Sequence, residues 1–346
     1  MNTKRVRQFL SKPILFKRSR TQHSSTNRFG KRARVVGYAV ILSLALLTLA
    51  SILDRWYASR YTTIVTKTRA ASPLDSGTLN LTEVSAPAQV TIFGEQVPMD
   101  SWEVRERFER EFYYNLGNPD QLLLYWKRSQ RYFPRIEKAL KDAGIPDDFK
   151  YLMVAESGIR NIKSPANANG FWQFIPGTGM KYGLRVDDQI DERMDPDLAT
   201  QAAIRYFEKM RATLPSWILV AAGYNMGEDN VRVAMDWQHQ ANYWNLYLND
   251  ETMRYILRIA VIKELLEHGE KYKLDFLHAM PYHEPQFRTV VVQGPIPSIS
   301  DWAQIQGYAY KDVKMFNPWL IGRMIPDGTF TLKLPATDLD RTTIQK

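Results

Sequence analysis

The sequence contains no cysteine at any of its 346 positions. Disulfide bonds and thiolate metal sites are therefore excluded, and the absence is compatible with an oxidising compartment without requiring one. Histidine is also scarce, with five residues, and none of them lies at a metal-ligand spacing such as H-E-x-x-H. We expect neither a metal site nor a cofactor.

Positive charge is concentrated at one end of the chain, whose formal net charge is +9. Residues 1–34 contain eleven Lys or Arg and no Asp or Glu, which leaves 35 of the 46 basic residues against all 37 acidic ones, a net charge of −2. A basic groove for nucleic acid is thus not supported in the rest of the chain. The tail itself is explained as a topology signal that contacts anionic lipids.

An uncharged run of nineteen residues, VVGYAVILSLALLTLASIL, follows the tail at residues 35–53. It is about long enough to cross a bilayer core of ~30 Å as a helix. The positive-inside rule keeps residues 1–34 in the cytoplasm and sends the chain after the run across the membrane. The alternative is a cleaved signal peptide, whose apolar core usually has about 7 to 15 residues. We predict a retained single-pass anchor.

Composition divides the remainder into a linker and two folded parts. Residues 54–97 are rich in Ser, Thr, Ala and Pro, which is typical of a linker. Helical periodicity dominates residues 98–284, where Ser, Asp and Pro precede apolar runs and Gly144 and Gly227 end them. In residues 285–338, the β-like runs FRTVVVQG and TFTLKLP enclose two short helical segments. We therefore expect a mainly α protein with a small α+β (βααβ) C-terminal module.

The segment DDFKYLMVAESGIR, residues 147–160, carries a carboxylate where a helix would have an apolar residue. Phe149, Leu152 and Met153 precede Glu156 by seven, four and three positions, so a helix places all four side chains on one face. A carboxylate buried on such a face requires a partner or a raised pKa. A structural ion pair and a catalytic acid both meet this requirement.

Groups suited to sugar binding follow Glu156. Gln173 comes after two aromatic residues, and Tyr224 and Asn225 end an otherwise apolar helix. Aromatic faces can stack on pyranose rings, and amides and phenols can bond hydroxyl and acetamido groups. Core packing is the better local explanation for Trp172 and its aromatic neighbours, while helix-end bonding explains Tyr224 and Asn225 equally well.

Four segments agree in order and spacing with a known family: AESG, SPANANGFWQFIPGTGMKYGL, DERMDPDLATQAAIRYF and LVAAGYNMG. They resemble the catalytic domain of the lytic transglycosylases with a goose-type-lysozyme (SLT) fold, especially the membrane-bound murein transglycosylase D subgroup. The resemblance covers roughly residues 100–270. It implies that Glu156 is the single catalytic acid and that Ser164, Gln173, Tyr224 and Asn225 bind the glycan.

The C-terminal module is similar to a lysin-motif (LysM) domain, a class that binds N-acetylglucosamine chains. The segments SISDWAQIQGYAYKDVKMFNPWL and IPDGTFTLKLP carry the spacing of this class. The usual Gly-Asp-Thr-Leu after the first strand is replaced by QGPIPSI. The resemblance therefore implies the fold more directly than sugar binding, and a purely structural module stays an alternative.

The family implies cleavage of the β-1,4 bond between N-acetylmuramic acid and N-acetylglucosamine in peptidoglycan, with the catalytic domain in the periplasm. A glycosidase normally uses two carboxylates, whereas the resemblance offers one. The implied reaction uses groups of the sugar: its acetamido oxygen stabilises the positive centre, and its 6-hydroxyl attacks to form a 1,6-anhydro product. Glu156 would act first as acid and then as base.

A second carboxylate could come from the acidic loop VDDQIDERMDPD, which contains Asp187, Asp188, Asp191 and Glu192. We expect instead a solvated loop in which Arg193 pairs with a neighbouring acid. Three other functions stay open: lysozyme-type hydrolysis of the same bond, a non-catalytic peptidoglycan-binding scaffold, and a membrane adaptor acting through residues 1–34.

Overall fold

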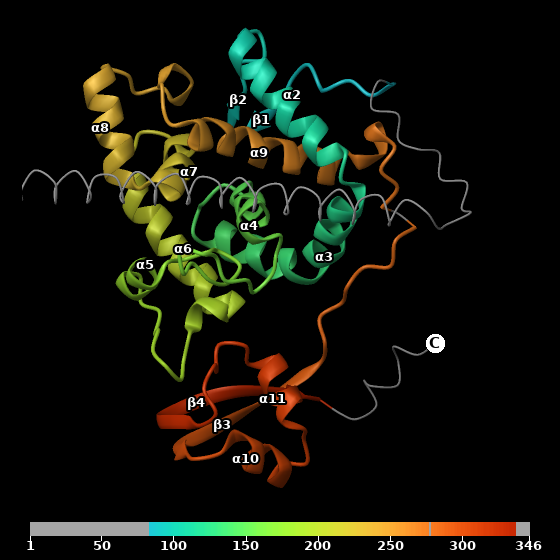
Figure 1. Cartoon of the computed structure of the whole chain (residues 1–346), viewed down its shortest axis with the longest axis vertical. Coiled ribbons are helices and arrows are strands. Elements are labelled where there is room, and N and C mark those ends of the chain that lie inside the picture. The colour runs from blue at the N-terminus through green and yellow to red at the C-terminus, as the bar shows by residue number, and fades with distance from the viewer. Residues whose placement is uncertain (1–82, 277, 337–346) are drawn as a thin grey trace, which may run out of the picture. The chain divides into compact units, whose positions relative to one another are not determined.

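The structure is a computed structural model and describes residues 83–276 and 278–336 (Figure 1). It has the predicted character, a mainly helical chain that ends in a small module with a two-stranded sheet. The predicted tail and the predicted anchor at residues 35–53 lie outside the described residues. In the described ranges, no helix is both long and apolar enough to cross a membrane.

The first two long helices are amphipathic and pack by their apolar faces. Helix α2 (Trp102–Leu116) buries Phe108, Phe112 and Leu116, which recur every four residues and so lie on one face. Helix α3 (Pro119–Asp142) begins with a proline, whose missing N–H is one that a first helical turn leaves unbonded. Both helices lie close to the expected segments.

Helix α4 (Phe149–Ser157) runs through the interior and ends beside the candidate acid. Phe149, Leu152 and Met153 are fully buried, as the predicted face requires. The helix stops at Gly158, which adopts a left-handed backbone with φ of 60°. A Cβ atom at Gly158 would lie 2.5 Å from the ring of Tyr125, so this turn requires glycine for both its φ and its space.

The helices that follow α4 complete the helical part of the chain, and α9 packs against α4 (Figure 1). Asp195 caps α6, as predicted, because its carboxylate accepts the N–H groups of Asp197 and Leu198. Gly227 ends α7, also as predicted. The elements are α5 (Pro176–Lys181), η2 (Glu192–Met194), α6 (Pro196–Arg211), α7 (Trp217–Met226), α8 (Glu228–Gln238), η3 (Tyr243–Asn245), α9 (Asp250–Glu267) and η4 (Gly269–Tyr272).

Part of the expected linker belongs to the folded core. Strands β1 (Thr91–Ile92) and β2 (Glu95–Gln96) form a short antiparallel hairpin. Ile92 and Phe93 are buried, and the Phe93 ring lies 4.6 Å from that of Phe149. The prediction of a linker as far as residue 97 is therefore wrong for this stretch. The stretch is mostly small and polar in composition, but its few apolar residues pack against α4 and shield that helix from solvent.

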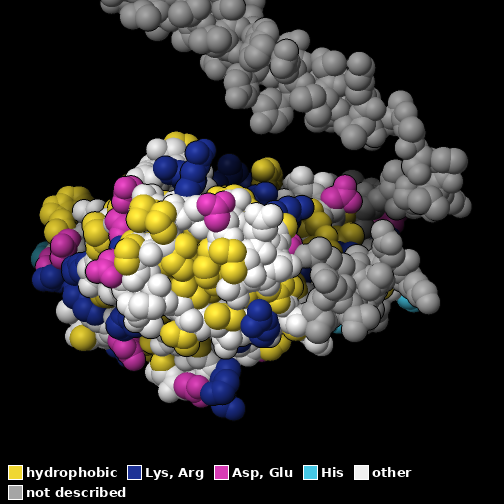
Figure 2. Space-filling model, turned by 90° about the horizontal axis from the view of Figure 1, so that it is seen from below, with side chains coloured by type: hydrophobic (Ala, Val, Ile, Leu, Met, Phe, Trp, Pro, Cys, Tyr) yellow, Lys and Arg dark blue, Asp and Glu magenta, His cyan; other side chains and the backbone are white. Residues whose placement is uncertain are grey.

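The C-terminal module has the predicted order of strand, helix, helix and strand. Its elements are β3 (Phe287–Ile296), α10 (Ile299–Ile305), α11 (Tyr310–Phe316) and β4 (Ile325–Pro335), and the two strands pair antiparallel. Figure 2 views the molecule from below, the end at which Figure 1 draws this module, and shows apolar side chains gathered near the middle of that face. Val291 and Ile305 of the module are largely exposed.

Two separate clusters of apolar residues stabilise the described chain. The larger one includes residues of α2, α3, α4, α6, α7, α8, α9 and the β1–β2 hairpin, and Ala155, the neighbour of Glu156, packs against it. The smaller one fills the C-terminal module and includes Ile190, a residue from the acidic loop of the helical part.

Candidate functional site

A pocket of about 300 Å³ brings together four of the predicted functional residues. It is lined by Glu156, Gln173, Phe174, Ile175, Thr178, Tyr206, Tyr224, Asn225 and Gly227. A larger cavity, of about 620 Å³, is lined by other residues and contains none of the predicted ones. We therefore place the candidate site at the smaller pocket.

Glu156 supplies the acid of the pocket from the last turn of α4. Its side chain is half-buried, and the phenol of Tyr255 on α9 donates a hydrogen bond of 2.5 Å to Oε1. Burial raises the pKa of Glu156 to about 7, although the bond from Tyr255 and the charge of Arg258 both act to lower it. A carboxyl with this pKa can hold or release a proton near neutrality.

Tyr255 is the functional residue that the sequence analysis missed. It is buried, and burial raises the pKa of its phenol well above the ordinary value, so the hydroxyl stays protonated and donates. A buried phenol in an apolar helix needs a hydrogen-bond partner, which is the signal that could have singled it out. The partner lies 99 residues away along the chain, beyond any local pattern.

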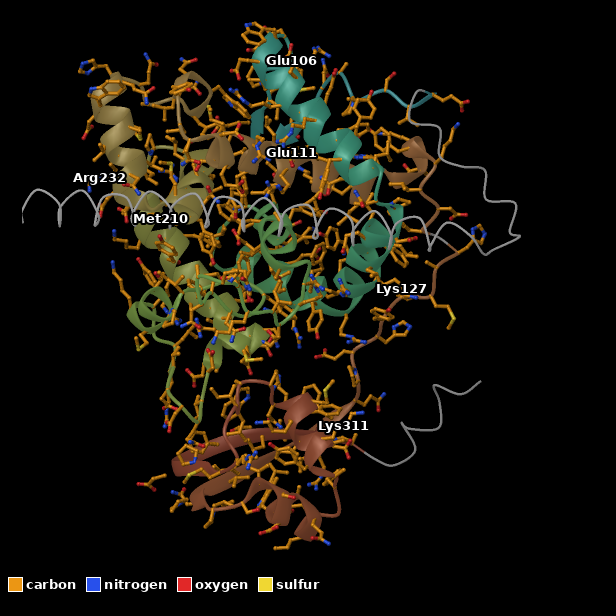
Figure 3. The ribbon with its side chains drawn as sticks, viewed as in Figure 1. Glu106, Glu111, Lys127, Met210, Arg232 and Lys311 are labelled. Atoms are coloured by element: carbon orange, nitrogen blue, oxygen red, sulfur yellow. The ribbon has the colours of Figure 1, made fainter. Side chains whose placement is uncertain are left out.

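A cluster of charges between α2 and α9 holds Arg258 in place. Glu111, labelled in Figure 3, is a buried carboxylate on α2. It accepts hydrogen bonds from Arg254 at 3.0 Å and from Arg258 at 3.2 Å. Arg258 also pairs with Glu251. Because Arg258 is shared with these two carboxylates, its charge offsets only part of the burial effect on Glu156.

Gln173 lines the pocket in a constrained conformation. Its φ is 50°, in the left-handed region that non-glycine residues seldom adopt. Its Nε2 donates to the carbonyl oxygens of Ile162 at 2.9 Å and Gly170 at 2.7 Å. These bonds use both amide protons and leave the side-chain oxygen as the group that can accept a hydrogen bond from a ligand.

Tyr224 and Asn225 reach the pocket from the end of α7. The Tyr224 hydroxyl donates to the carbonyl oxygen of Trp172 at 2.5 Å, so its bonding to the backbone leaves chiefly the ring to face a ligand. Asn225 Oδ1 accepts from the hydroxyl of Thr252 at 2.7 Å. This bond fixes the amide with its oxygen towards Thr252, and Nδ2 is left as the donor.

The aromatic residues before the pocket mostly pack in the core, as local reasoning favoured. Trp172 is fully buried, and its Nε1 donates to Thr200 Oγ1 at 2.9 Å. Phe171 and Phe174 are also buried. The less buried aromatic rings that line the pocket are therefore those of Tyr206 and Tyr224.

Ser164 does not line the pocket. Its hydroxyl accepts the backbone N–H of Ala168 at 3.0 Å, and its own N–H donates to the carbonyl of the same residue at 2.8 Å. The serine shapes the loop that follows α4. A direct contact with glycan stays a prediction from the family resemblance.

The acidic loop differs from the prediction in one respect. Arg193 pairs with a neighbouring acid, Asp191, as expected, but both residues are buried rather than solvated. Burial acts to raise the pKa of Asp191, yet hydrogen bonds from Arg193 and Asn169 outweigh it and hold the pKa below its usual value. Asp187 and Asp188 are exposed.

Residues 83–276 and 278–336 contain no cluster of side chains that could bind a metal ion. Groups of three or more His, Cys, Asp or Glu side chains that could hold a metal ion do not occur there.

Two family models match this chain. Residues 134–247 match the transglycosylase SLT domain, and residues 288–338 match the soluble lytic transglycosylase C-terminal LysM-like domain. The resemblance inferred from the motifs is thereby confirmed for these two parts. The first match contains the four predicted residues that line the pocket, and Tyr255 lies beyond its end.

The curated relatives include the membrane-bound lytic murein transglycosylase D of Escherichia coli strain K12, which is 30% identical over 151 residues. The protein of the same name from strain O6:H1 gives the same values. The matched region covers 42% of this chain and 33% of each relative, so the chain spans about a third of their length.

Among solved structures, an inactive mutant of the lytic transglycosylase Slt from Pseudomonas aeruginosa aligns with a TM-score of 0.30 and 20% identity. The alignment covers 40% of this chain and 24% of that one.

The raised pKa of Glu156 predicts a pH-dependent loss of stability. The group shifts from an ordinary 4.5 to about 7, so the folded state binds the proton more tightly and loses stability as pH rises across this window. Glu156→Gln removes the free-energy cost of burying an ionised carboxylate at high pH. Relative to the wild type, the variant should gain about 3 kcal/mol of unfolding free energy between pH 4 and pH 8.

Urea unfolding at several pH values measures this gain. The control is Glu106→Gln, which removes an exposed carboxyl on α2 (Figure 3) and should show no such trend. A difference between Glu156→Gln and wild type that stays constant with pH would show that Glu156 is not buried in the way described.

Removal of the Tyr255 hydroxyl should make Glu156 a weaker acid. The hydrogen bond from Tyr255 lowers the pKa of Glu156. Tyr255→Phe should therefore raise the pKa of Glu156 by roughly one to two, which corresponds to the free energy of a hydrogen bond to a charged group. Carbon-13 NMR titration of the carboxyl measures the shift. Tyr206→Phe removes a hydroxyl from the same pocket and leaves the Tyr255 bond intact, so it should have little effect. An unchanged or lower pKa in Tyr255→Phe would contradict the assignment.

Proposed function

We propose that this chain is a peptidoglycan lytic transglycosylase that cleaves the β-1,4 bond between N-acetylmuramic acid and N-acetylglucosamine and leaves a 1,6-anhydro end. The observation that carries the proposal is a single carboxyl in the pocket, Glu156, with its pKa raised to about 7. The match to the SLT domain and the relatives named as lytic murein transglycosylases support the substrate class.

The pocket is suited to a reaction with one acid. Among its lining residues, Glu156 is the only carboxylic acid. Asp191, the buried candidate for a second, is engaged by Arg193 and Asn169 and does not line the pocket. A two-carboxylate mechanism would need a second acid in this pocket, so the lining favours a reaction whose nucleophiles come from the substrate.

Glu156 acts twice in the proposed reaction. Its proton goes to the glycosidic oxygen as the bond to C1 breaks, and the acetamido oxygen of the same sugar bonds to C1. The 6-hydroxyl then attacks C1, displaces the acetamido oxygen and gives its proton to Glu156. The acid is regenerated and no water is consumed. A pKa near the working pH suits both proton transfers.

The fixed amides of the pocket suit the polar groups of the sugar. Asn225 Nδ2 can donate to the acetamido oxygen and orient it towards C1, while the Gln173 oxygen can accept from a hydroxyl. The Tyr255 hydroxyl stabilises the carboxylate after the first proton transfer. Each group is already held by the protein, so little reorganisation is needed when the substrate binds.

The mass of the product tests the reaction. Digested peptidoglycan should release fragments one water lighter than those from hydrolysis, and Glu156→Gln should lower the rate by roughly 10²- to 10⁴-fold, the usual contribution of a general acid. The variant should still bind glycan. Products of full mass would instead establish lysozyme-type hydrolysis. Intact glycan with the wild-type protein would favour a binding scaffold.

The proposal also places residues 35–53 in the cytoplasmic membrane, residues 1–34 in the cytoplasm and the pocket in the periplasm. The uncharged run after a basic tail supports this placement, as does the membrane-bound relative. The full chain should stay with membranes after carbonate extraction and should be protease-accessible in spheroplasts. Leu46→Arg with Leu47→Arg should weaken retention, since each charge costs about 3 kcal/mol to insert. Release of the unaltered chain by carbonate would contradict the anchor.

A further inference from the structure

The acidic hairpin, residues 185–192, leaves the helical part of the chain between α5 and η2 (Figure 1). A bridge between Val186 and Asp191 pairs its two arms. The carboxylate of Asp187 accepts the backbone N–H of Ile190 at 2.8 Å and closes the turn. A segment that the sequence predicts to be solvated is thus an ordered hairpin with a defined tip.

The tip of the hairpin docks in the C-terminal module. Ile190 is fully buried and belongs to the apolar cluster of the module, where it forms a bridge with Leu320. Beside it, the backbone N–H of Gly322 donates to the carbonyl oxygen of Gln189 at 2.9 Å. The core of the module is therefore completed by a residue from the helical part.

Asp191 connects the module to the loop that forms one wall of the pocket. Its backbone N–H donates to the carbonyl oxygen of Trp319 in the module at 2.7 Å. Its carboxylate accepts hydrogen bonds from Arg193 at 2.8 and 2.7 Å and from Asn169 Nδ2 at 2.9 Å. Asp191 is thus hydrogen-bonded both to the C-terminal module and to residues of the helical part.

Arg193 extends the connection to the residue beside Gln173. Its Nη1 donates to the carbonyl oxygens of Asn167 at 2.7 Å and Phe174 at 2.9 Å. The loop also approaches Arg193 closely at Gly170, where a Cβ atom would lie 1.8 Å from the Arg193 carbonyl oxygen. The Gly170 carbonyl in turn accepts from Gln173 Nε2 at 2.7 Å. The path from the module to the pocket is therefore continuous.

We propose that the C-terminal module positions the catalytic pocket, by holding Ile190 and Asp191 so that Arg193 fixes the loop carrying Gln173 and Phe174. Ile190, Asp191 and Arg193 are positioning residues, which act on the pocket through the loop. This role is independent of any sugar bound by the module. The effect on the rate of glycan cleavage rests on the proposed function, whereas the effect on the order of the pocket loop does not.

Three substitutions test the connection in the full chain at different points. Gly322→Val lies in the module, and its Cβ would meet Gln189 Oε1 at 1.8 Å and the Gln189 Cα at 3.0 Å, which separates hairpin from module. Ile190→Ser removes the apolar tip. Asp191→Asn keeps the hairpin docked and weakens the bonds to Arg193. The control, Ile305→Ser, changes a residue of the module that is 80% exposed.

Hydrogen exchange and steady-state kinetics are the two measurements. In all three test variants, the backbone amide of Asn169, which donates to Phe174 O at 3.0 Å, should exchange at least about tenfold faster than in the wild type. Displacement of Gln173 should lower kcat roughly 10- to 100-fold, with a smaller change in KM. Ile190→Val should retain wild-type behaviour, as should Ile305→Ser.

The outcomes separate this proposal from the proposed function. If Gly322→Val and Ile190→Ser speed exchange in β3 and β4 while Asn169 and kcat match the control, the module does not position the pocket. If one of these two variants fails to fold, the other still tests the docking of the hairpin, and Asp191→Asn, which leaves the core of the module complete, tests the link from Asp191 to the loop. If the wild type cleaves no glycan, the proposed function fails, and the exchange at Asn169 still tests the connection.

Discussion

The burial of one carboxyl at the end of an apolar helix is the constraint on which the rest of the site depends. The free-energy cost of burying a charge raises the pKa of Glu156, and Tyr255 and Arg258 limit that rise without reversing it. Arg258 is itself held by Glu111 and Glu251, so its charge is only partly available to Glu156. A direct ion pair at Glu156 would keep the carboxyl ionised near neutrality and unable to donate a proton.

The helices around α4 maintain the pKa of Glu156 in two ways. Their apolar residues exclude water from the carboxyl, and α9 supplies a hydrogen bond to it. Helix α9 contributes Tyr255 to Glu156 and Thr252 to Asn225, so a single helix orients two groups of the pocket. The phenol of Tyr224 binds the backbone at Trp172, which ties α7 to the opposite wall. Because the protein already satisfies one side of these groups, only selected atoms face a ligand.

Much of the fold could be predicted from local signals, since caps, prolines and apolar periodicity act within a few residues. Asp195, Gly227 and the apolar face of α4 follow such rules. The position of Tyr255 in an apolar helix indicates that its hydroxyl needs a partner, but no local signal identifies that partner as Glu156, 99 residues away. The β1–β2 hairpin was mistaken for linker because its few apolar residues gain stability only from the tertiary packing around Phe149.

The acidic hairpin exposes the limit of composition as a guide to burial. Four carboxylates among the eight residues 185–192 predict a solvated loop, but two of these residues, Ile190 and Asp191, are buried for different reasons. Ile190 is buried by the hydrophobic effect in the module. Asp191, the next residue, is buried together with Ile190, so its carboxylate needs hydrogen-bond donors within the protein. Arg193 and Asn169 provide them. The same bonds that make the burial of Asp191 tolerable are those that order the wall of the pocket, so module packing and pocket geometry cannot vary independently.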